Sequence, residues 1–205
     1  MKIVVTAGPT REHLDPVRFL SNPSTGKMGF AVAAEAARRG HEVVLVAGPV
    51  SLRTPNGVRR VDVVSARDMM RETKCAAKGA DALVATAAVA DWRPAACAKR
   101  KLKKGEMAPF VRLVRNPDVL KTVKFPMKVG FAAETGDPVA EAARKCREKG
   151  LAFIVANDVT APGAGFGVDT NKVAFVFPDG HVERLPLMTK RALARRIVAK
   201  LALAR

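Results

Sequence analysis

The stretch Ser21–Gly29, which reads SNPSTGKMG, has the composition of an anion-binding turn at the start of a helix. Ser24 and Thr25 are residue types that often cap a helix N-terminus, and Gly26 favours a loop. The first N–H groups of a helix lack partners within the helix and lie at the positive end of its dipole. We therefore expect this stretch, with the charge of Lys27 beside it, to bind a phosphate or a carboxylate.

The same stretch is not the phosphate-binding loop of P-loop nucleotide hydrolases. That motif needs a glycine five residues before its Gly-Lys pair and a Ser or Thr after the lysine. Ser21 and Met28 stand at those two positions, so the hydroxyl that would bind Mg²⁺ is missing. The alternative to an anion site is a capped surface helix with a solvated Lys27.

The elements around this stretch alternate between strand and helix patterns. Apolar runs predict strands over residues 2–6, 42–47, 58–64, 81–87, 110–114, 127–133 and 152–156. Helices are expected over residues 27–39, 65–78, 118–124 and 138–149, and after Thr189. Residues 172–177 and 181–185 flank a Pro-Asp-Gly turn and predict a hairpin. Residues 11–20 and 88–108 are expected to be irregular, the second as a mobile, Lys/Arg-rich flap.

This order of elements predicts an α/β fold, with a Rossmann-like, doubly wound, mainly parallel sheet, helices on both faces and a C-terminal antiparallel hairpin. No linker interrupts the pattern, so residues 1–205 are expected to form a single domain. Ligands of such sheets bind at the carboxyl ends of the strands. The loops 8–29, 87–104 and 131–135, and the segment from residue 157 onward, should therefore converge on one edge.

Composition narrows the possible partners. No apolar run is long enough to span a bilayer, and the chain opens on a strand pattern, so we expect a cytoplasmic protein with no membrane partner. The three cysteines are widely spaced, and neither they nor the three histidines form a metal-binding pattern. The formal net charge is +17, but only 5% of the residues are aromatic and tyrosine is absent. This balance favours attraction of small anions over a dedicated nucleic-acid reader.

Several motifs in order resemble phosphopantothenoylcysteine synthetase, the ligase of coenzyme A biosynthesis. They are VTAGPTRE at residues 5–12, LDPVR at 14–18, the SNPSTGKMG stretch, AAVAD at 87–91, KLKK at 101–104, NPD at 116–118, GFAAET at 130–135 and AND at 156–158. The resemblance covers essentially the whole chain. In many bacteria this ligase is the C-terminal half of a bifunctional protein whose other half is a flavin decarboxylase. That half has no counterpart here, so no decarboxylation is expected, and the sequence does not tell whether the chain is free-standing.

The resemblance implies an amide ligase that joins 4′-phosphopantothenate to cysteine and uses CTP and Mg²⁺. The carboxylate attacks the α-phosphate of CTP, which gives an acyl-cytidylate and pyrophosphate, and the cysteine amine then displaces CMP. The choice of CTP over ATP follows only from the bacterial relatives. The family also implies a homodimer. A strongly basic site would help to bring two anionic substrates together.

The resemblance assigns two catalytic residues. Asn22 matches the asparagine that binds the acyl-nucleotide intermediate, and its amide can donate to an oxyanion and accept from an amine. The alternative is a loop asparagine bonded to its own backbone. Lys101 matches the first lysine of a Lys-x-Lys-Lys flap that contacts the nucleotide phosphates, where a cation stabilises the transferring group. Its alternative is a solvated charged loop over residues 93–104.

The other expected site residues bind the substrates, and no residue is assigned as a metal ligand. The residues assigned to the nucleotide, besides Lys101, are Gly8, Ser24, Gly26, Ala85, Thr86, Ala87, Asp91, Pro117, Asp118, Val119, Leu120, Phe131, Lys145 and Lys149. The segment from Pro117 to Leu120 would place backbone N–H groups at a helix start. Lys145 and Lys149 have a spacing that equally describes an exposed helix face. Arg18 aligns with an arginine near the phosphopantothenate, which could come from across a dimer.

Two rival functions remain open at this stage. An NAD(P)-dependent oxidoreductase would suit the sheet, but the first turn reads AGPT rather than G-x-G-x-x-G, and the second strand ends without an acidic residue. A basic nucleic-acid-binding module would suit the charge, but no recognised motif of that class is present.

Overall fold

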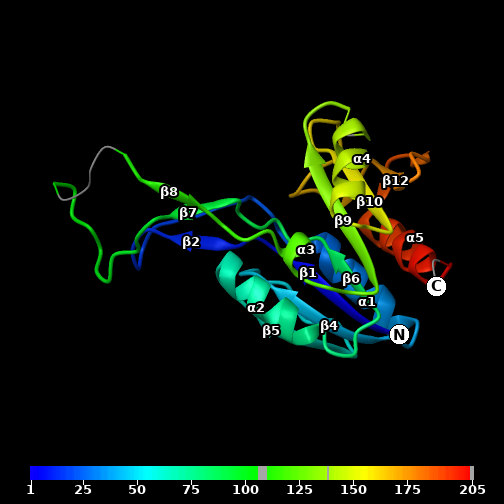
Figure 1. The fold of residues 1–205 in the computed structure, drawn as a ribbon, viewed down its shortest axis with the longest axis horizontal. Helices are drawn as coiled ribbons and strands as arrows, with labels where there is room; N and C mark the ends of the chain where they lie inside the picture. Colours follow the sequence, from blue (N-terminus) through cyan, green and yellow to red (C-terminus); the bar gives the residue numbers. More distant parts are fainter. Residues whose placement is uncertain (106–109, 138, 204–205) are drawn as a thin grey trace.

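An eight-stranded mixed sheet forms the centre of the computed structural model, which describes residues 1–105, 110–137 and 139–203 (Figure 1). In spatial order its strands are β13 (Val182–Arg184), β12 (Val173–Val176), β10 (Phe153–Asp158), β9 (Met127–Glu134), β6 (Ala82–Ala85), β1 (Lys2–Ala7), β4 (Glu42–Ala47) and β5 (Val58–Asp62). The six strands from β10 to β5 are parallel, and β12 and β13 add an antiparallel edge. The predicted sheet and its terminal hairpin are confirmed.

Helices cover both faces of this sheet, which explains why its strands read as continuous apolar runs. One face carries α1 (Lys27–Arg38) and α5 (Lys190–Leu203), and the other carries α2 (Ala66–Ala76), α3 (Val119–Thr122) and α4 (Val139–Glu148). Ile3 and Val5 of β1 pack toward the first pair of helices, and Val4 packs toward α2. The predicted helices are therefore present; Pro138, the expected first residue of α4, lies outside the described residues.

Two hairpins contain strands in the segments 11–20 and 88–108, which were expected to be irregular; only the strand near residues 110–114 was expected. Residues 11–21 form β2 (Arg11–His13) and β3 (Phe19–Ser21), and β7 (Trp92–Pro94) pairs with β8 (Leu113–Arg115). Asp15 shapes the first turn, because its carboxylate accepts from the N–H groups of Val17 and Arg18. Residues 106–109, which include the end of the predicted flap, lie outside the described residues. A further short pair joins β11 (Thr170–Asn171) to β14 (Met188–Thr189).

The two hairpins together form an arm that projects away from the sheet (Figure 1). We use "arm" for residues 11–21 and the described part of 92–115, in which β2 lies against β7. Seven of the eleven exposed large apolar side chains among the described residues belong to it: Val17, Phe19, Leu20, Trp92, Phe110, Val111 and Leu113. The arm therefore presents an apolar surface that this chain alone does not cover.

No helix within the described residues combines the length and the apolar character that a bilayer crossing requires.

Candidate active site

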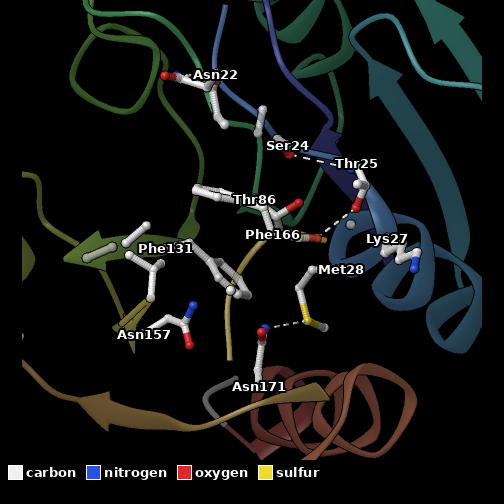
Figure 2. A pocket seen from close by; sticks show the side chains of 18 of the residues that line it. Asn22, Ser24, Thr25, Lys27, Met28, Thr86, Phe131, Asn157, Phe166 and Asn171 are labelled. Carbon is white, nitrogen blue, oxygen red and sulfur yellow. Dashed lines mark hydrogen bonds between the residues drawn. The ribbon is translucent and has the colours of Figure 1, made fainter. Parts of the chain in front are cut away.

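The loops that follow the parallel strands converge on one edge of the sheet, as the sequence predicts, and enclose a cavity of about 420 Å³ (Figure 2). We call it the main cavity. Eight of the predicted site residues line it: Asn22, Ser24, Gly26, Thr86, Ala87, Asp91, Phe131 and Lys145. Segments that are more than 100 residues apart in the chain therefore share one site.

The turn over residues 22–29, here the helix-start turn, leads into α1 without a side-chain cap. The N-cap is Gly26, in the left-handed conformation at φ +77°, and no described side chain caps the helix. The prediction of a Ser24 or Thr25 cap is wrong, because the Thr25 hydroxyl donates to the Phe166 carbonyl at 2.9 Å and the Ser24 oxygen accepts only from Gly26 N–H at 3.4 Å. The start of α1 is thus left open toward the main cavity, as an anion site requires.

Lys27, whose charge was expected to lie beside this turn, is paired with a carboxylate. Its ammonium lies 2.7 Å from Asp169 and donates to the carbonyl of Gly167 at 3.2 Å. A bound anion at the turn would have to compete with this carboxylate for the lysine.

Glycines allow the strand ends and the helix start to approach closely. A Cβ at Gly29 would lie 2.4 Å from the Thr86 hydroxyl and 2.5 Å from the Ala7 methyl, so no side chain fits there. Gly8, at φ +78°, does not line the main cavity; its Cα would lie 3.4 Å from a Cβ built on Gly26. The structure therefore places Gly8 behind the helix-start turn, as a packing partner of Gly26.

Asn22 joins the helix-start turn to the loop after β6. Its amide donates to the carbonyl of Ala88 at 3.1 Å, so the alternative of an asparagine bonded to its own local backbone is wrong. The side chain is exposed, and no residue that the structure describes donates to its oxygen. Asn22 therefore keeps an acceptor available for a ligand group.

A smaller cavity of about 180 Å³ adjoins the main one, and we call it the side cavity. The predicted nucleotide residues that line it are Ala85, Ala87, Asp91, Pro117, Asp118, Val119, Leu120, Phe131 and Lys149. Ala87, Asp91 and Phe131 line both cavities, so the two spaces share a wall. At the start of α3 the Asp118 carboxylate accepts from the N–H of Lys121 at 3.0 Å, so the side chain of Asp118 caps this short helix.

Lys145 of α4 and Lys149, directly after its end, line these cavities and are half-buried, unlike a solvated helix face. Lys145 pairs with Glu134 at 2.6 Å, and Lys149 pairs with Asp118 at 2.7 Å. Burial raises the pKa of Asp118, but the hydrogen bonds from the Lys149 ammonium and the Lys121 N–H outweigh it and hold the pKa below its usual value. Both lysines thus stand beside the site, each with a carboxylate partner, and Lys145 lies on the main cavity, where a phosphate could replace Glu134.

Arg18 and Lys101 lie together on the arm and line neither of these cavities. With Leu102, Lys103 and Lys104 they border a third, open cavity of about 490 Å³. Hydrogen bonds from the Arg18 guanidinium lower the pKa of Asp15 well below its usual range, against the effect of burial. The structure therefore groups the two residues with each other, and within one chain it does not group them with Asn22.

Sequence reasoning assigned no role to three buried polar residues that line the main cavity: Asn157, Asn171 and Lys190. Asn157 and Asn171 are 8% and 4% exposed, and their side-chain oxygens have no partner among the described residues. Asn157 belongs to a motif that was matched without a role, and only its place after a strand could have indicated one. Nothing in the pattern singled out Asn171 or the buried Lys190, because their surroundings depend on how the glycine-rich segment folds.

Comparisons with known proteins identify the family of the chain and a solved structure with the same fold. The family model described as "DNA/pantothenate metabolism flavoprotein C-terminal domain" matches residues 1–204. Proteins named coenzyme A biosynthesis bifunctional protein CoaBC are 45% identical in Vibrio parahaemolyticus and in Bacillus subtilis, over 97% and 98% of this chain. The chain spans about half the length of these relatives, 51% and 50%. A crystal structure of the C-terminal domain of CoaBC is 39% identical with a TM-score of 0.83, and the match covers 98% of this chain and 94% of that one.

Proposed function

The chain belongs to the family of the DNA/pantothenate metabolism flavoprotein C-terminal domain, and from this membership we propose that it is a phosphopantothenate–cysteine ligase of coenzyme A biosynthesis. In the proposed reaction the carboxylate of 4′-phosphopantothenate attacks the α-phosphate of CTP and releases pyrophosphate. The amine of cysteine then displaces CMP from the acyl-cytidylate and forms the amide. The two rival functions, an oxidoreductase and a nucleic-acid-binding module, find no support in the matches.

The observation that carries this proposal is the shared wall between the two cavities. A ligase of this kind must hold a nucleotide and an acid with their reacting atoms in contact. Phe131 and Asp91 border both cavities, with the open start of α1 and Asn22 on the main side and Asp118 and Lys149 on the other. Two adjoining spaces of this kind suit two substrates that meet at their common boundary.

We assign the nucleoside end of CTP to the side cavity and the acid to the main cavity. The small residues Ala85 and Ala87 allow a base to approach the strand end, and the Asp118 carboxylate disfavours a phosphate there. The phosphates would then extend past Phe131 toward Lys145 and the start of α1, where positive groups gather. Asn22 offers a neutral donor and acceptor for the acyl intermediate.

Mg²⁺ fits this site through the nucleotide rather than through a protein cage. In the part of the chain that the structure describes, no group of three or more His, Cys, Asp or Glu side chains could hold a metal. Mg²⁺ is commonly bound by one or two carboxylates together with substrate phosphates. Asp91, at the boundary of the two cavities, is the carboxylate placed for this. When bound, the ion would neutralise charge on the phosphates.

The arm supports a homodimer in which Arg18 and Lys101 act on the site of a second copy. They lie apart from Asn22 within one chain, and the arm that carries them has an exposed apolar surface. A second copy packed on that surface would bury it and bring the lysine-rich segment over the partner's main cavity. The cytoplasmic location stays a prediction from the sequence.

Pyrophosphate release tests the proposed function directly. We expect release only when CTP, Mg²⁺ and 4′-phosphopantothenate are present together, because the acid is the nucleophile of the first step. CTP should exceed ATP, GTP and UTP as the nucleotide. Release with CTP alone, or no release with all three components, would contradict the proposal.

A further inference from the structure

The loop over residues 165–169, here the clamp loop, forms part of the wall of the main cavity. Gly165 and Phe166 line the cavity, and the loop has no strand partner until β11 begins at Thr170. Gly165 and Phe166 are half-buried and residues 167–169 are exposed, and the carbonyls of this loop cannot obtain hydrogen-bond donors from a sheet. Its conformation therefore depends on donors supplied by other segments.

Lys190, the first residue of α5, supplies most of these donors. Its ammonium donates to the carbonyls of Gly165 at 3.0 Å, Phe166 at 3.1 Å and Val168 at 2.5 Å. Its backbone N–H donates to the carbonyl of Asp169 at 2.9 Å. An ammonium has three N–H donors, so all of them are used on the clamp loop.

Burying the ammonium of Lys190 costs free energy, which its contacts must compensate. Lys190 is 6% exposed, and none of the described carboxylates forms an ion pair with it, since Asp169 pairs with Lys27. Burial lowers the pKa of Lys190, and the Lys27 charge acts in the same direction against the smaller effect of Asp169. A buried cation held only by carbonyls costs free energy, but beside the main cavity it adds positive potential for an anion.

The clamp loop is also tied to the helix-start turn. The carbonyl of Phe166 accepts from the Thr25 hydroxyl as well as from Lys190, and the carbonyl of Gly167 accepts from the Lys27 ammonium. The loop is therefore fixed between α5 on one side and the open start of α1 on the other. Movement of the loop would change the shape of the main cavity at Phe166 (Figure 2).

We propose that Lys190 is a positioning residue that holds the clamp loop as a wall of the main cavity and thereby sets the affinity for the anionic substrate bound there. This inference rests on the proposed ligase function. Lys190 acts through the carbonyls of Gly165, Phe166 and Val168, which use its three N–H donors.

The test compares Lys190→Met with Lys200→Met in the full chain. Both changes remove an ammonium from α5, but Lys200 pairs with Glu183 at 2.7 Å and does not line the main cavity. We expect Lys190→Met to raise the KM for CTP or 4′-phosphopantothenate about tenfold, a loss typical of a charged hydrogen bond, with a smaller effect on kcat. Hydrogen exchange of residues 163–169 should become faster. Lys200→Met should show neither change, and Lys190→Arg, which keeps the charge and donors, should restore most of the affinity.

A purely structural role predicts a different result. If Lys190→Met lowers only the melting temperature and keeps the wild-type KM values and exchange rates, the inference is overturned. If that variant does not fold, Thr25→Val removes the second donor to Phe166 and should raise KM by a smaller factor; an unchanged KM there also overturns it. If the wild-type chain shows no ligase activity, the proposed function fails, and hydrogen exchange of the three variants still decides whether Lys190 holds the loop.

Discussion

The guanidinium of Arg18 donates a hydrogen bond to the backbone carbonyl of Leu102 at 3.0 Å. The buried carboxylate of Asp15 completes the contact, because it accepts from Arg18 and from the N–H of Leu102 at 3.2 Å. This network anchors the segment that contains Lys101 to the β2–β3 hairpin. The lysine-rich segment is thus held by specific contacts, in contrast to the alternative of a solvated charged loop.

The proposed roles of Lys101 and Asn22 separate the two steps of the reaction. Lys101→Gln should reduce pyrophosphate release about 100-fold or more, because the cation on the transferring phosphate is lost. Asn22→Asp should still release pyrophosphate but form little amide product, because the added charge repels the acyl-nucleotide. Single-turnover assays of both products measure this split. Lys99→Gln, an exposed change in the same segment, is the control, and wild-type turnover in either test variant would refute its assigned role.

Mixing the same two variants tests whether Lys101 acts on a partner's site. A dimer that contains one Asn22→Asp chain and one Lys101→Gln chain would hold one intact site if the two residues come from different chains. Random exchange of subunits should then restore about a quarter of the wild-type rate, since half of the dimers are mixed and each has one active site. Activity is measured after co-refolding or co-expression. If both residues serve the same chain's site, the mixture stays inactive.

The buried carboxylate of Glu35 predicts a dependence of stability on pH. Hydrogen bonds from Arg38 lower its pKa to about 2, with a further contribution from Arg39 and against the effect of burial. Since the pKa in the folded state lies below the unfolded value of about 4.3, the stabilisation is complete above that pH and is lost as the pH falls toward 2.

Glu35→Gln should therefore destabilise the chain at pH 7, and by less at pH 3. Urea unfolding at pH 7, 5 and 3 measures the difference. Glu42→Gln is the matched control, because Glu42 is 68% exposed and lies 4.0 Å from Lys2. If Glu35→Gln lowers the free energy of unfolding by the same amount at all three pH values, the prediction is contradicted.

Two buried side-chain oxygens that have no partner among the described residues, in Thr73 and Asn171, allow stability and ligand binding to be separated. Thr73 on α2 has a fully buried hydroxyl with no partner among the described residues, so Thr73→Val should stabilise the chain by up to about 1 kcal/mol without changing KM. Asn171→Leu should leave the ligand-free chain at least as stable but raise KM, because this amide lines the main cavity. Thermal unfolding and steady-state kinetics measure the two effects. An equal KM in both variants would remove Asn171 from the site.

The parallel strands and their covering helices could be predicted because each is an apolar run of the right length. Ile3, Leu83 and Ile154 are buried between two layers, and the sequence around them contains no competing pattern. Their order also predicted that the loops at the strand ends would meet. The arm could not be predicted in this way: Phe19–Ser21 is exposed throughout, so burial imposes no period on it.

The finer details of the site depend on distant parts of the chain. The Thr25 side chain is suited to cap α1, but its hydroxyl instead donates a hydrogen bond to the carbonyl of Phe166, 141 residues away. The distance between Asn22 and Lys101 also lies beyond local patterns, because it depends on the direction of the arm. The residues matched by motif lie where the strands end, whereas the position of Asn171 and Lys190 at the main cavity depends on how the glycine-rich segment folds.

The contact at Gly29 limits how this protein can vary. Its missing side chain leaves the first turn of α1 directly against Thr86 and Ala7, so backbone and short groups alone fix the separation between the helix and the end of β6. Larger or smaller residues elsewhere can reshape the cavities, but none can move the start of α1 away from the end of β6 without displacing the helix from the sheet. Changes in substrate preference would therefore have to arise from the outer loops and the arm, while this inner distance stays constant.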